Sequence, residues 1–294
     1  MPGPDKDLTT MAEITAAMVK DLRDKTQAGM MEAKRLLTEA DGDMDAAIKA
    51  FREKNAKATV KEGRTSAEGV VEALVREHNK LGVLIEINSE TDFVARNEEF
   101  SALARDMAKH AIENPGAATV DELLEATHTE TGSPAKLRIQ DVFAKMRENI
   151  IFKRFAAYQT EDGTVDAYIH MGGQIGVLVE LTGEGMEIKT LAREIAMHIA
   201  AAKPKFLSKS DVPEAKVAEE RDIVKTRALA DPKNAGKPAE IMDKVIEGGV
   251  GTFYKEAVLL EQPYIREPKQ TVAQLIKGKT EIKRFVRFEI GEAS

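Results

Sequence analysis

The strongest constraint on the fold of this chain is an internal repeat. Residues 68–87, EGVVEALVREHNKLGVLIEI, align without gaps with residues 162–181, DGTVDAYIHMGGQIGVLVEL, so that Gly82 matches Gly176. In each copy the first apolar run alternates with polar residues, which is the two-residue period of a half-buried strand. A short connection containing glycine leads to a second apolar run. Each copy is therefore predicted to open with a β-hairpin.

Each hairpin is followed by a segment with the apolar periodicity of a helix. The stripes are Phe100, Leu103, Ala104, Met107 and Ala111 in the first copy, and Ile188, Leu191, Ala192, Ile195 and Ile199 in the second. The first copy holds more residues between strand and helix, and the surplus lies within NSETDFVARNEE, residues 88–99. Because an extra segment on a duplicated scaffold is not needed by the core, we expect it to carry function.

Each copy is also predicted to close with a strand. IFKRFAAYQ at 151–159 and IKRFVRFEI at 282–290 share the tripeptide Lys-Arg-Phe and are rich in apolar residues typical of strands. In the second copy a long stretch, residues 209–270, must leave the subdomain and return before this strand. Its helical patterns, over 213–229 and 240–247, are separated by the turn DPKNAGKP. They predict an antiparallel helical hairpin.

The amino-terminal region has the pattern of a three-helix module. Thr10 and Glu13 have the spacing of a capping box, Gly29 interrupts the helical pattern, and Asp43 is placed to cap a third helix. The helices are expected over residues 12–24, 30–40 and 44–54. The polar and basic stretch NAKATVKEGRTS that follows is predicted to be a linker.

Together these patterns predict an α+β protein whose core subdomains each combine a small antiparallel sheet with helices. The predicted parts are a disordered leader at 1–10, a three-helix domain at 11–55, a linker at 56–67, an amino-terminal core subdomain at 68–160, a carboxy-terminal core subdomain at 161–208 and 271–294, and the helical hairpin at 209–270.

Composition narrows the function. The net charge of −7, the aromatic content of 5% and the absence of Trp argue against a general nucleic-acid binder, which needs clustered cations and stacking platforms. The absence of Cys excludes disulfides and zinc–thiolate sites. With neither an apolar signal core nor a run long enough to span a membrane, the chain is expected to be cytoplasmic. A protein partner is favoured.

Signatures of catalysis or nucleotide binding are missing from the sequence. It contains no phosphate-binding GxxxxGK[ST] motif, no GxGxxG after a strand and no His pair at metal-ligand spacing. His110 and His198 occupy equivalent helix positions in the two copies, and inherited structural histidines are the favoured interpretation. We therefore expect no cofactor, no bound metal, no direct nucleotide binding and no enzymatic activity.

TDFVARN, residues 91–97, resembles the T-D-F-V-A-[KR]-[ND] motif of the elongation factor Ts family. It lies within the surplus segment of the repeat. Residues 19–48 resemble that family's amino-terminal domain, and IGVLVEL, AMHIAAAKP and VRFEIGE match its later segments in order. The resemblance runs from about residue 11 to residue 293, nearly the whole chain.

The resemblance implies a fold, a partner and a site. The fold would have a ubiquitin-associated-like three-helix domain, and the partner would be the GTPase elongation factor Tu, for which the chain would act as guanine nucleotide exchange factor. By resemblance, Asp92 and Phe93 reach the GTPase domain, where the Phe ring wedges between two helices beside the magnesium site. His170 would support that ring, and Lys34 would lie on the same interface. The expected partner-binding set is completed by Thr91, Val94, Met146 and Ile265.

The chain departs from the family pattern at a few positions. Gln27 stands where a Gly is usual, Met146 and Arg147 replace an Ile-Gly pair, and Arg266 replaces an apolar residue. The chain ends at RFEIGEAS, without the carboxy-terminal helical module of some members. We expect any grip of that module on the GTPase to be absent.

Other interpretations stay open at this point. A ribosome- or RNA-binding accessory protein could use the basic residues Lys57, Lys61 and Arg64 of the linker. A structural oligomer could dimerise through residues 209–270. Taken alone, Phe93 would be interpreted as a core aromatic, and Asp92 as the cap of the helix that follows.

Overall fold

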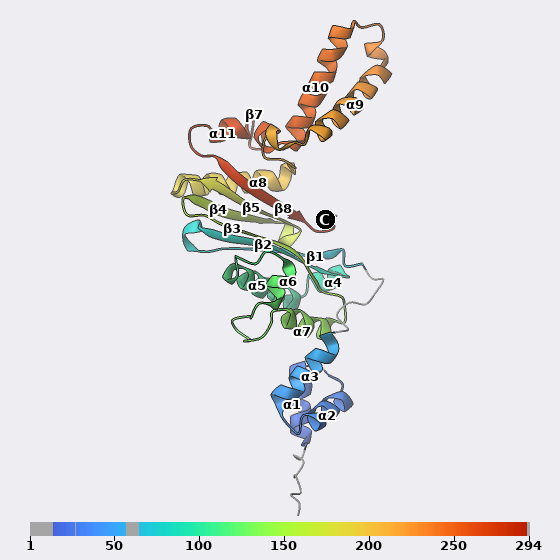
Figure 1. Cartoon of the computed structure of the whole chain (residues 1–294), viewed down its shortest axis with the longest axis vertical. Helices are drawn as coiled ribbons and strands as arrows, with labels where there is room; N and C mark the ends of the chain where they lie inside the picture. The colour runs from blue at the N-terminus through green and yellow to red at the C-terminus, as the bar shows by residue number, and fades with distance from the viewer. Residues whose placement is uncertain (1–13, 27, 57–64, 293–294) are drawn as a thin grey trace, which may run out of the picture. The chain divides into compact units, whose positions relative to one another are not determined.

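A computed structural model describes residues 14–26, 28–56 and 65–292 (Figure 1). Contacts divide the chain into two units. The first comprises residues 1–69, 87–110 and 117–153, and the second comprises residues 70–86, 111–116 and 154–294. The predicted capping box at Thr10 and Glu13, the atypical Gln27, and the basic residues Lys57, Lys61 and Arg64 lie outside the described residues.

The first unit begins with three helices. They are α1 (Ala16–Thr26), α2 (Met30–Glu39) and α3 (Met44–Ala56). Asp43 caps α3 as predicted, since its Oδ1 accepts from the backbone N–H groups of Asp45 and Ala46 over 2.9 and 3.0 Å. Leu22, Leu36 and Leu37 form the centre of their core, which Ala144 from a later helix joins. The apolar stripes of these short helices thus find a common core.

Four further helices follow in the chain. They are α4 (Asp92–Ala95), α5 (Glu98–Glu113), α6 (Val120–Glu125) and α7 (Lys136–Met146). Buried polar contacts connect three of them: His110 Nε2 of α5 donates to the carbonyl of Leu123 in α6 over 2.8 Å, and Asp106 of α5 forms an ion pair with Arg138 of α7 at 2.8 Å. His110 is therefore a structural histidine, as expected. Helices α6 and α7 were not predicted from the sequence.

Two three-stranded sheets confirm the predicted α+β fold class and its duplication. One has the order β1-β2-β3 and the other β4-β5-β8. The strands are β1 (Glu68–Val75), β2 (Leu81–Ser89), β3 (Ile151–Gln159), β4 (Gly163–His170), β5 (Ile175–Thr182) and β8 (Ile282–Glu289). In both, the hairpin of the repeat pairs with the strand that carries Lys-Arg-Phe. β4 and β5 pair antiparallel from Gly163 opposite Thr182 to His170 opposite Ile175.

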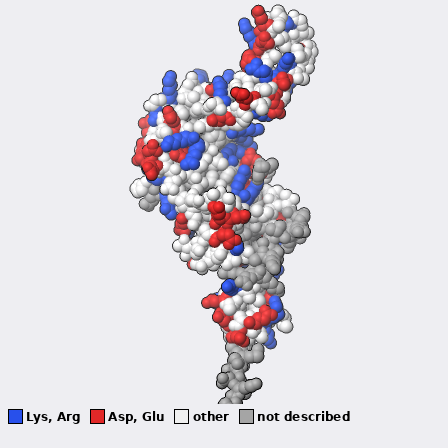
Figure 2. All heavy atoms as spheres, viewed as in Figure 1, with Lys and Arg blue, Asp and Glu red and all other residues white. Residues whose placement is uncertain are grey.

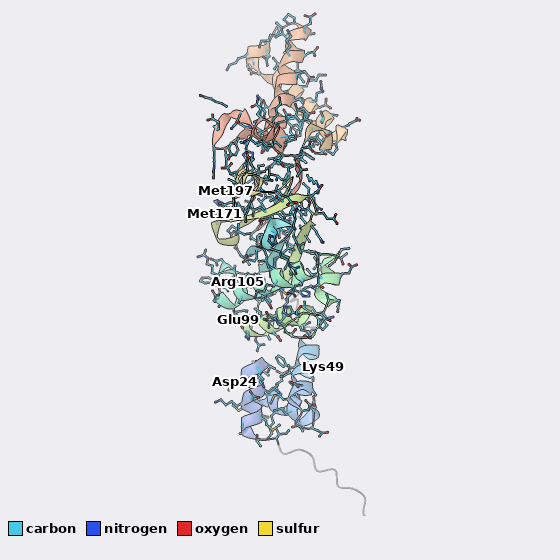
Figure 3. The ribbon with its side chains drawn as sticks, turned by 90° about the vertical axis from the view of Figure 1, so that its left-hand side faces the viewer. Asp24, Lys49, Glu99, Arg105, Met171 and Met197 are labelled. Atoms are coloured by element: carbon cyan, nitrogen blue, oxygen red, sulfur yellow. The ribbon has the colours of Figure 1, made fainter. Side chains whose placement is uncertain are left out.

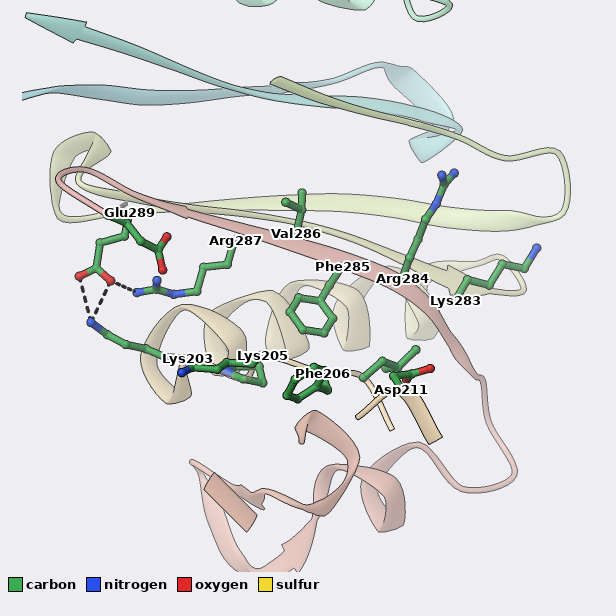
Figure 4. A pocket seen from close by; sticks show the side chains of 13 residues that line it. Lys203, Lys205, Phe206, Asp211, Lys283, Arg284, Phe285, Val286, Arg287 and Glu289 are labelled. Atoms are coloured by element: carbon green, nitrogen blue, oxygen red, sulfur yellow. Dashed lines mark hydrogen bonds and ion pairs between the residues drawn. The ribbon is translucent and has the colours of Figure 1, made fainter. Parts of the chain in front are cut away.

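Helix α8 (Met186–Ala202) covers one face of the β4-β5-β8 sheet (Figure 1). Its apolar stripe meets Val177, Val179 and Leu181 of β5 in a fully buried core. Along β8 the side chains alternate: Phe285 and Arg287 point toward the segment that follows α8, whereas Arg284 and Val286 point to the opposite side (Figure 4). The two-residue period of a strand is therefore visible along β8.

The opposite face of this sheet packs against the parts of β1 and β2 in the same unit, through Val71, Leu84, Val165 and Leu178. Two glycines permit the approach. A Cβ at Gly82 would lie 2.7 Å from Val165 Cγ1, and one at Gly176 would lie 2.4 Å from Val71 Cγ1. Because Gly82 matches Gly176 and Val71 matches Val165 in the repeat, the two hairpins make equivalent contacts.

The predicted helical hairpin is formed by α9 (Glu214–Ala230) and α10 (Ala239–Ala257) (Figure 1). Figure 2 shows basic and acidic side chains interspersed over it. Helix α10 extends beyond Glu247, the last residue predicted as helical, because Gly249 packs on the other helix: a Cβ there would lie 2.3 Å from Val224 Cγ1. The chain returns through β6 (Pro263–Tyr264), β7 (Glu267–Thr271) and α11 (Val272–Ile276).

Candidate functional site

The surplus segment of the repeat contains α4, a single helical turn that is held at its N-cap. Thr91 is the N-cap, and its Oγ1 accepts from the N–H of Val94 over 3.4 Å. The same hydroxyl donates to Glu148 Oε1 over 2.8 Å, and the Thr91 N–H donates to Glu148 Oε2 over 3.1 Å. The carboxylate of Glu148, a residue distant in sequence, therefore holds both the backbone N–H and the hydroxyl of Thr91.

Phe93 and Val94 face opposite ways on this turn. Val94 is buried at 9% exposure, whereas Phe93 is 84% exposed. The interpretation of Phe93 as a core aromatic is therefore wrong, because the neighbouring Val94 is the residue that anchors the turn. An exposed ring of this size on a fixed turn presents a large apolar surface to water.

Asp92 occupies the first helical position and not the cap. Its carboxylate lies 3.2 Å from the guanidinium of Arg96, and both side chains are largely exposed. The interpretation of Asp92 as the helix cap is therefore wrong, because the Thr91 side chain caps the helix. A negative charge in the first helical turn is still favoured by the helix dipole.

Met146 lies close in sequence to the residue that fixes α4. Helix α7 ends at Met146, and Arg147 has φ of 63°, in the left-handed region. This turn leads directly to Glu148, the partner of Thr91. The half-buried Met146 and the TDFVARN turn are thus connected within the first unit through Glu148.

Lys34 lies on a groove between α1 and α2 with a volume of about 840 Å³. Met30 and Met31 line the same groove and are 62% and 80% exposed. Their exposure excludes a role as filler between helices. Flexible, polarizable methionines beside a cation are typical of adaptable binding surfaces.

His170 and Ile265 belong to the second unit. His170 is exposed at the end of β4, where its Nδ1 lies 3.0 Å from the Tyr168 hydroxyl. The next residue, Met171, is 69% exposed and lies on the same side of the unit as Met197 of α8 (Figure 3). Ile265, in the β6–β7 turn, is 43% exposed.

His198 is fully buried below Ile265 and has a defined tautomer. Its Nε2 donates to Gln262 Oε1 over 2.9 Å, and its Nδ1 accepts from the Ile265 N–H over 3.3 Å. Burial lowers the pKa of His198, although the bond to Gln262 opposes that shift. His198 is therefore a neutral structural residue, and its repeat counterpart His110 also has a structural role.

Comparison with known proteins decides the family. Residues 90–292 match the family model described as "Elongation factor TS". An "Elongation factor Ts" of Clostridium acetobutylicum is 42% identical over 95% of this chain and 93% of its own length. Those of Methylococcus capsulatus and Methylocella silvestris are each 44% identical, over 95% and 96% of this chain and 92% and 93% of their own lengths. The chain belongs to the elongation factor Ts family. It is a translation elongation factor.

Two negative findings concern the described residues only. No group of three or more His, Asp or Glu side chains in them could hold a metal ion. Among the helices described, none has the length and apolar character needed to cross a membrane.

Sequence reasoning missed several residues of this candidate site. Glu148 lies far from TDFVARN in sequence, and only the tertiary contact with Thr91 reveals it. The sequence draws attention to Met30 and Met31 through the Met-rich segment TQAGMM, residues 26–31. Helical periodicity alone, however, does not distinguish an exposed methionine from a packed one.

Proposed function

We propose that this protein is the guanine nucleotide exchange factor of elongation factor Tu, acting in the cytoplasm without chemistry of its own. The observation that carries the proposal is the 84% exposure of Phe93 on a turn fixed by Val94 and Thr91. An exposed aromatic ring on a fixed turn suits insertion into a partner, because the backbone that carries the ring is already ordered before binding. Membership of the elongation factor Ts family supports the same partner.

In the proposed mechanism, Phe93 enters between two helices of the GTPase beside its magnesium site, Asp92 contacts the same domain, and His170 supports the ring. A GTPase holds GDP through its phosphate loop and, indirectly, through Mg²⁺. Displacing the helices around that ion removes charge compensation from the phosphates, so GDP leaves faster. Because coupling between two ligands is reciprocal, incoming GTP weakens the hold of the exchange factor in turn.

A second contact would be made by the groove of the three-helix module. Lys34 supplies a charge there, and Met30 and Met31 supply an apolar surface that can adapt to a partner. We assign this groove to partner affinity and the TDFVARN turn to nucleotide release. Met146 and Ile265 are proposed as further contacts with the partner. Ile265 is exposed, and Met146 is only half-buried, so both side chains keep surface that a partner can cover.

The test is release of fluorescent GDP from elongation factor Tu by Phe93→Ala, compared with wild type. The variant should slow stimulated release about tenfold or more, the effect of losing about 1.4 kcal/mol, while the free energy of unfolding changes by less than about 0.5 kcal/mol, as at other surface sites. Leu229→Ala is the matched control, since Leu229 is a 67% exposed apolar residue on α9. Normal release by Phe93→Ala, or equal losses in both variants, would contradict the proposal.

Lys34→Ala separates affinity from release. It should raise the concentration of factor needed for half-maximal GDP release while leaving the maximal rate close to wild type. Lys225→Ala, an equivalent charge removal on α9, should change neither. A lower maximal rate for Lys34→Ala at saturating concentration would show that the groove participates in release itself.

A further inference from the structure

A cationic pocket of about 500 Å³ lies in the second unit, between the β1–β2 connection and helix α8. Its lining residues are Val75, Arg76, His78, Asn79, Asp166, Lys189 and Arg193. The basic side chains come from two elements that are distant in sequence. The pocket therefore exists only in the folded unit, and none of the residues assigned to the GTPase contact lines it.

Asp166 fixes one of these cations. Its side chain is 4% exposed, and its Oδ2 lies 3.0 Å from Nε of Arg193. The Arg193 guanidinium also donates to the carbonyl of Ala167, and Asp166 Oδ1 accepts from the Ala167 N–H over 2.9 Å. Burial raises the pKa of Asp166, and the nearby charges of Arg193 and Lys189 oppose that rise. Arg193 is thus held in one orientation, with donors left over for a ligand.

The other two cations, Arg76 and Lys189, form no ion pair within the described residues. In the part of the chain that the structure describes, neither Arg76 nor Lys189 has a carboxylate within ion-pair distance. Three positively charged side chains therefore line the pocket together with the single carboxylate of Asp166, in a chain whose net charge is −7. Such a local excess of positive charge raises the concentration of anions at the pocket.

The backbone beside the pocket places two consecutive non-glycine residues in the left-handed region, where the other copy of the repeat has two glycines. His78 and Asn79 have φ of 69° and 55°, and their repeat counterparts are Gly172 and Gly173, with φ of 65° and 99°. A non-glycine residue in this region costs on the order of 1 kcal/mol. The Asn79 side chain secures the turn by donating to the Val165 carbonyl over 2.9 Å. The strained turn keeps the His78 side chain at the pocket, where its counterpart has none.

We propose that this pocket binds the phosphate group of a small phosphorylated molecule. Arg193 and Arg76 offer planar donor pairs that match phosphate oxygens, and Lys189 adds a point charge. The volume admits a phosphate with a small attached group. A small molecule is favoured over a nucleic-acid backbone, because a strongly acidic chain lacks the extended cationic surface that backbone binding requires.

The test is calorimetric titration of the full chain with inorganic phosphate and with pyrophosphate at constant ionic strength. One saturable site is expected, with pyrophosphate the tighter ligand. Arg76→Ala and Lys189→Ala should each weaken binding about tenfold, the loss of about 1.4 kcal/mol. Lys225→Ala removes the same charge from α9 and should leave the affinity unchanged.

Three results would overturn the proposal. The first is the absence of saturable binding, and the second is an equal loss of affinity in Lys225→Ala, which would indicate a nonspecific charge effect. The third is binding of single-stranded RNA that depends on Arg76 and Lys189 without any binding of pyrophosphate. None of these results depends on nucleotide exchange, so the pocket and the proposed function can fail independently.

Discussion

Arg154 stacks on Phe288, with its guanidinium carbon 4.3 Å from the centroid of the ring. The repeat supplies the reciprocal contact, because Arg284 lies 4.2 Å over the ring of Tyr158. Arg154 and Arg284 are the matched arginines of the two Lys-Arg-Phe tripeptides, and the aromatic residues follow them at equal spacing. Each contact contributes about 0.5–2 kcal/mol. The closing strands of the two copies therefore hold each other by a reciprocal pair of contacts.

Each of these arginines also neutralises a buried carboxylate. Arg154 Nε lies 2.6 Å from Glu86, and Arg284 Nε lies 2.6 Å from Glu180, the repeat counterpart of Glu86. We expect Arg154→Met to lower the free energy of unfolding by about 3 kcal/mol, because removing one partner leaves the charge of a buried one poorly compensated. Arg284→Met should cost less, since Arg284 is 47% exposed and Arg154 only 23%.

Urea denaturation measures both changes, and a second variant tests the cause. Adding Glu86→Gln to Arg154→Met should recover part of the lost stability, because the double variant no longer buries the charge. Strictly additive losses would show that the pair itself is not the source.

The close approach of the two hairpins predicts that added methyl groups destabilise both copies. Gly82→Ala and Gly176→Ala should each lower the free energy of unfolding by about 1–3 kcal/mol through overpacking. Gly116→Ala is the control, since nothing lies within 4 Å of a Cβ there. Differential scanning calorimetry on the three variants checks the order, and a normal melting temperature for Gly176→Ala would contradict the contact with Val71.

Two glycines of α10 should respond in opposite directions. Gly249→Ala brings a methyl against Val224 and should destabilise the hairpin, whereas Gly251 has nothing within 4 Å of its added Cβ. Gly251→Ala should therefore stabilise by about 0.5–1 kcal/mol, the difference in helix propensity. Thermal melting followed by circular dichroism distinguishes them. Equal effects of the two substitutions would mean that the helices are not in the described contact.

Stability should decline below pH 6.5 because of His198. Its pKa in the folded protein is lowered from 6.5 by burial, so the unfolded chain takes up a proton first as the pH falls. The stabilisation is complete above pH 6.5 and is lost below it, with a slope of at most about 1.4 kcal/mol per pH unit. His198→Gln, although less stable at neutral pH, should show a smaller loss between pH 7.5 and 5.5 in urea titrations. A wild-type slope retained in the variant would assign the effect elsewhere.

The predicted boundaries of the helical hairpin can be tested by deletion. Replacing residues 214–254 by a short Gly-Ser bridge should leave a cooperatively folding core. Extending the deletion to residue 262 should unfold it, because Leu259 is fully buried in the core under α8 and Gln262 forms a hydrogen bond with His198.

Sedimentation of the shorter deletion also tests dimerisation. If residues 209–270 carry self-association, the protein with the deletion is monomeric under conditions in which the full chain is not.

Much of the fold could be predicted because its signals are local. The period-two run of β4, the apolar run of β5, the apolar stripe of α8 and the Asp43 cap depend on residues close in sequence. Because these local patterns occur twice in the sequence, they also predicted two similar subdomains. The short elements α6, β6 and β7 escaped prediction, because none of them is long enough to show a detectable periodicity.

The sequence alone determined the repeat, the strands and helices that belong to it, and the surplus segment in which TDFVARN lies. Only the tertiary structure decided which side chains of that segment face water, because the burial of Phe93 and Val94 depends on what packs against the turn. It also decided that Glu148 fixes Thr91 and that Arg76 and Arg193 share a pocket. Contacts between residues far apart in the chain form only when the whole fold closes, so no local pattern records them.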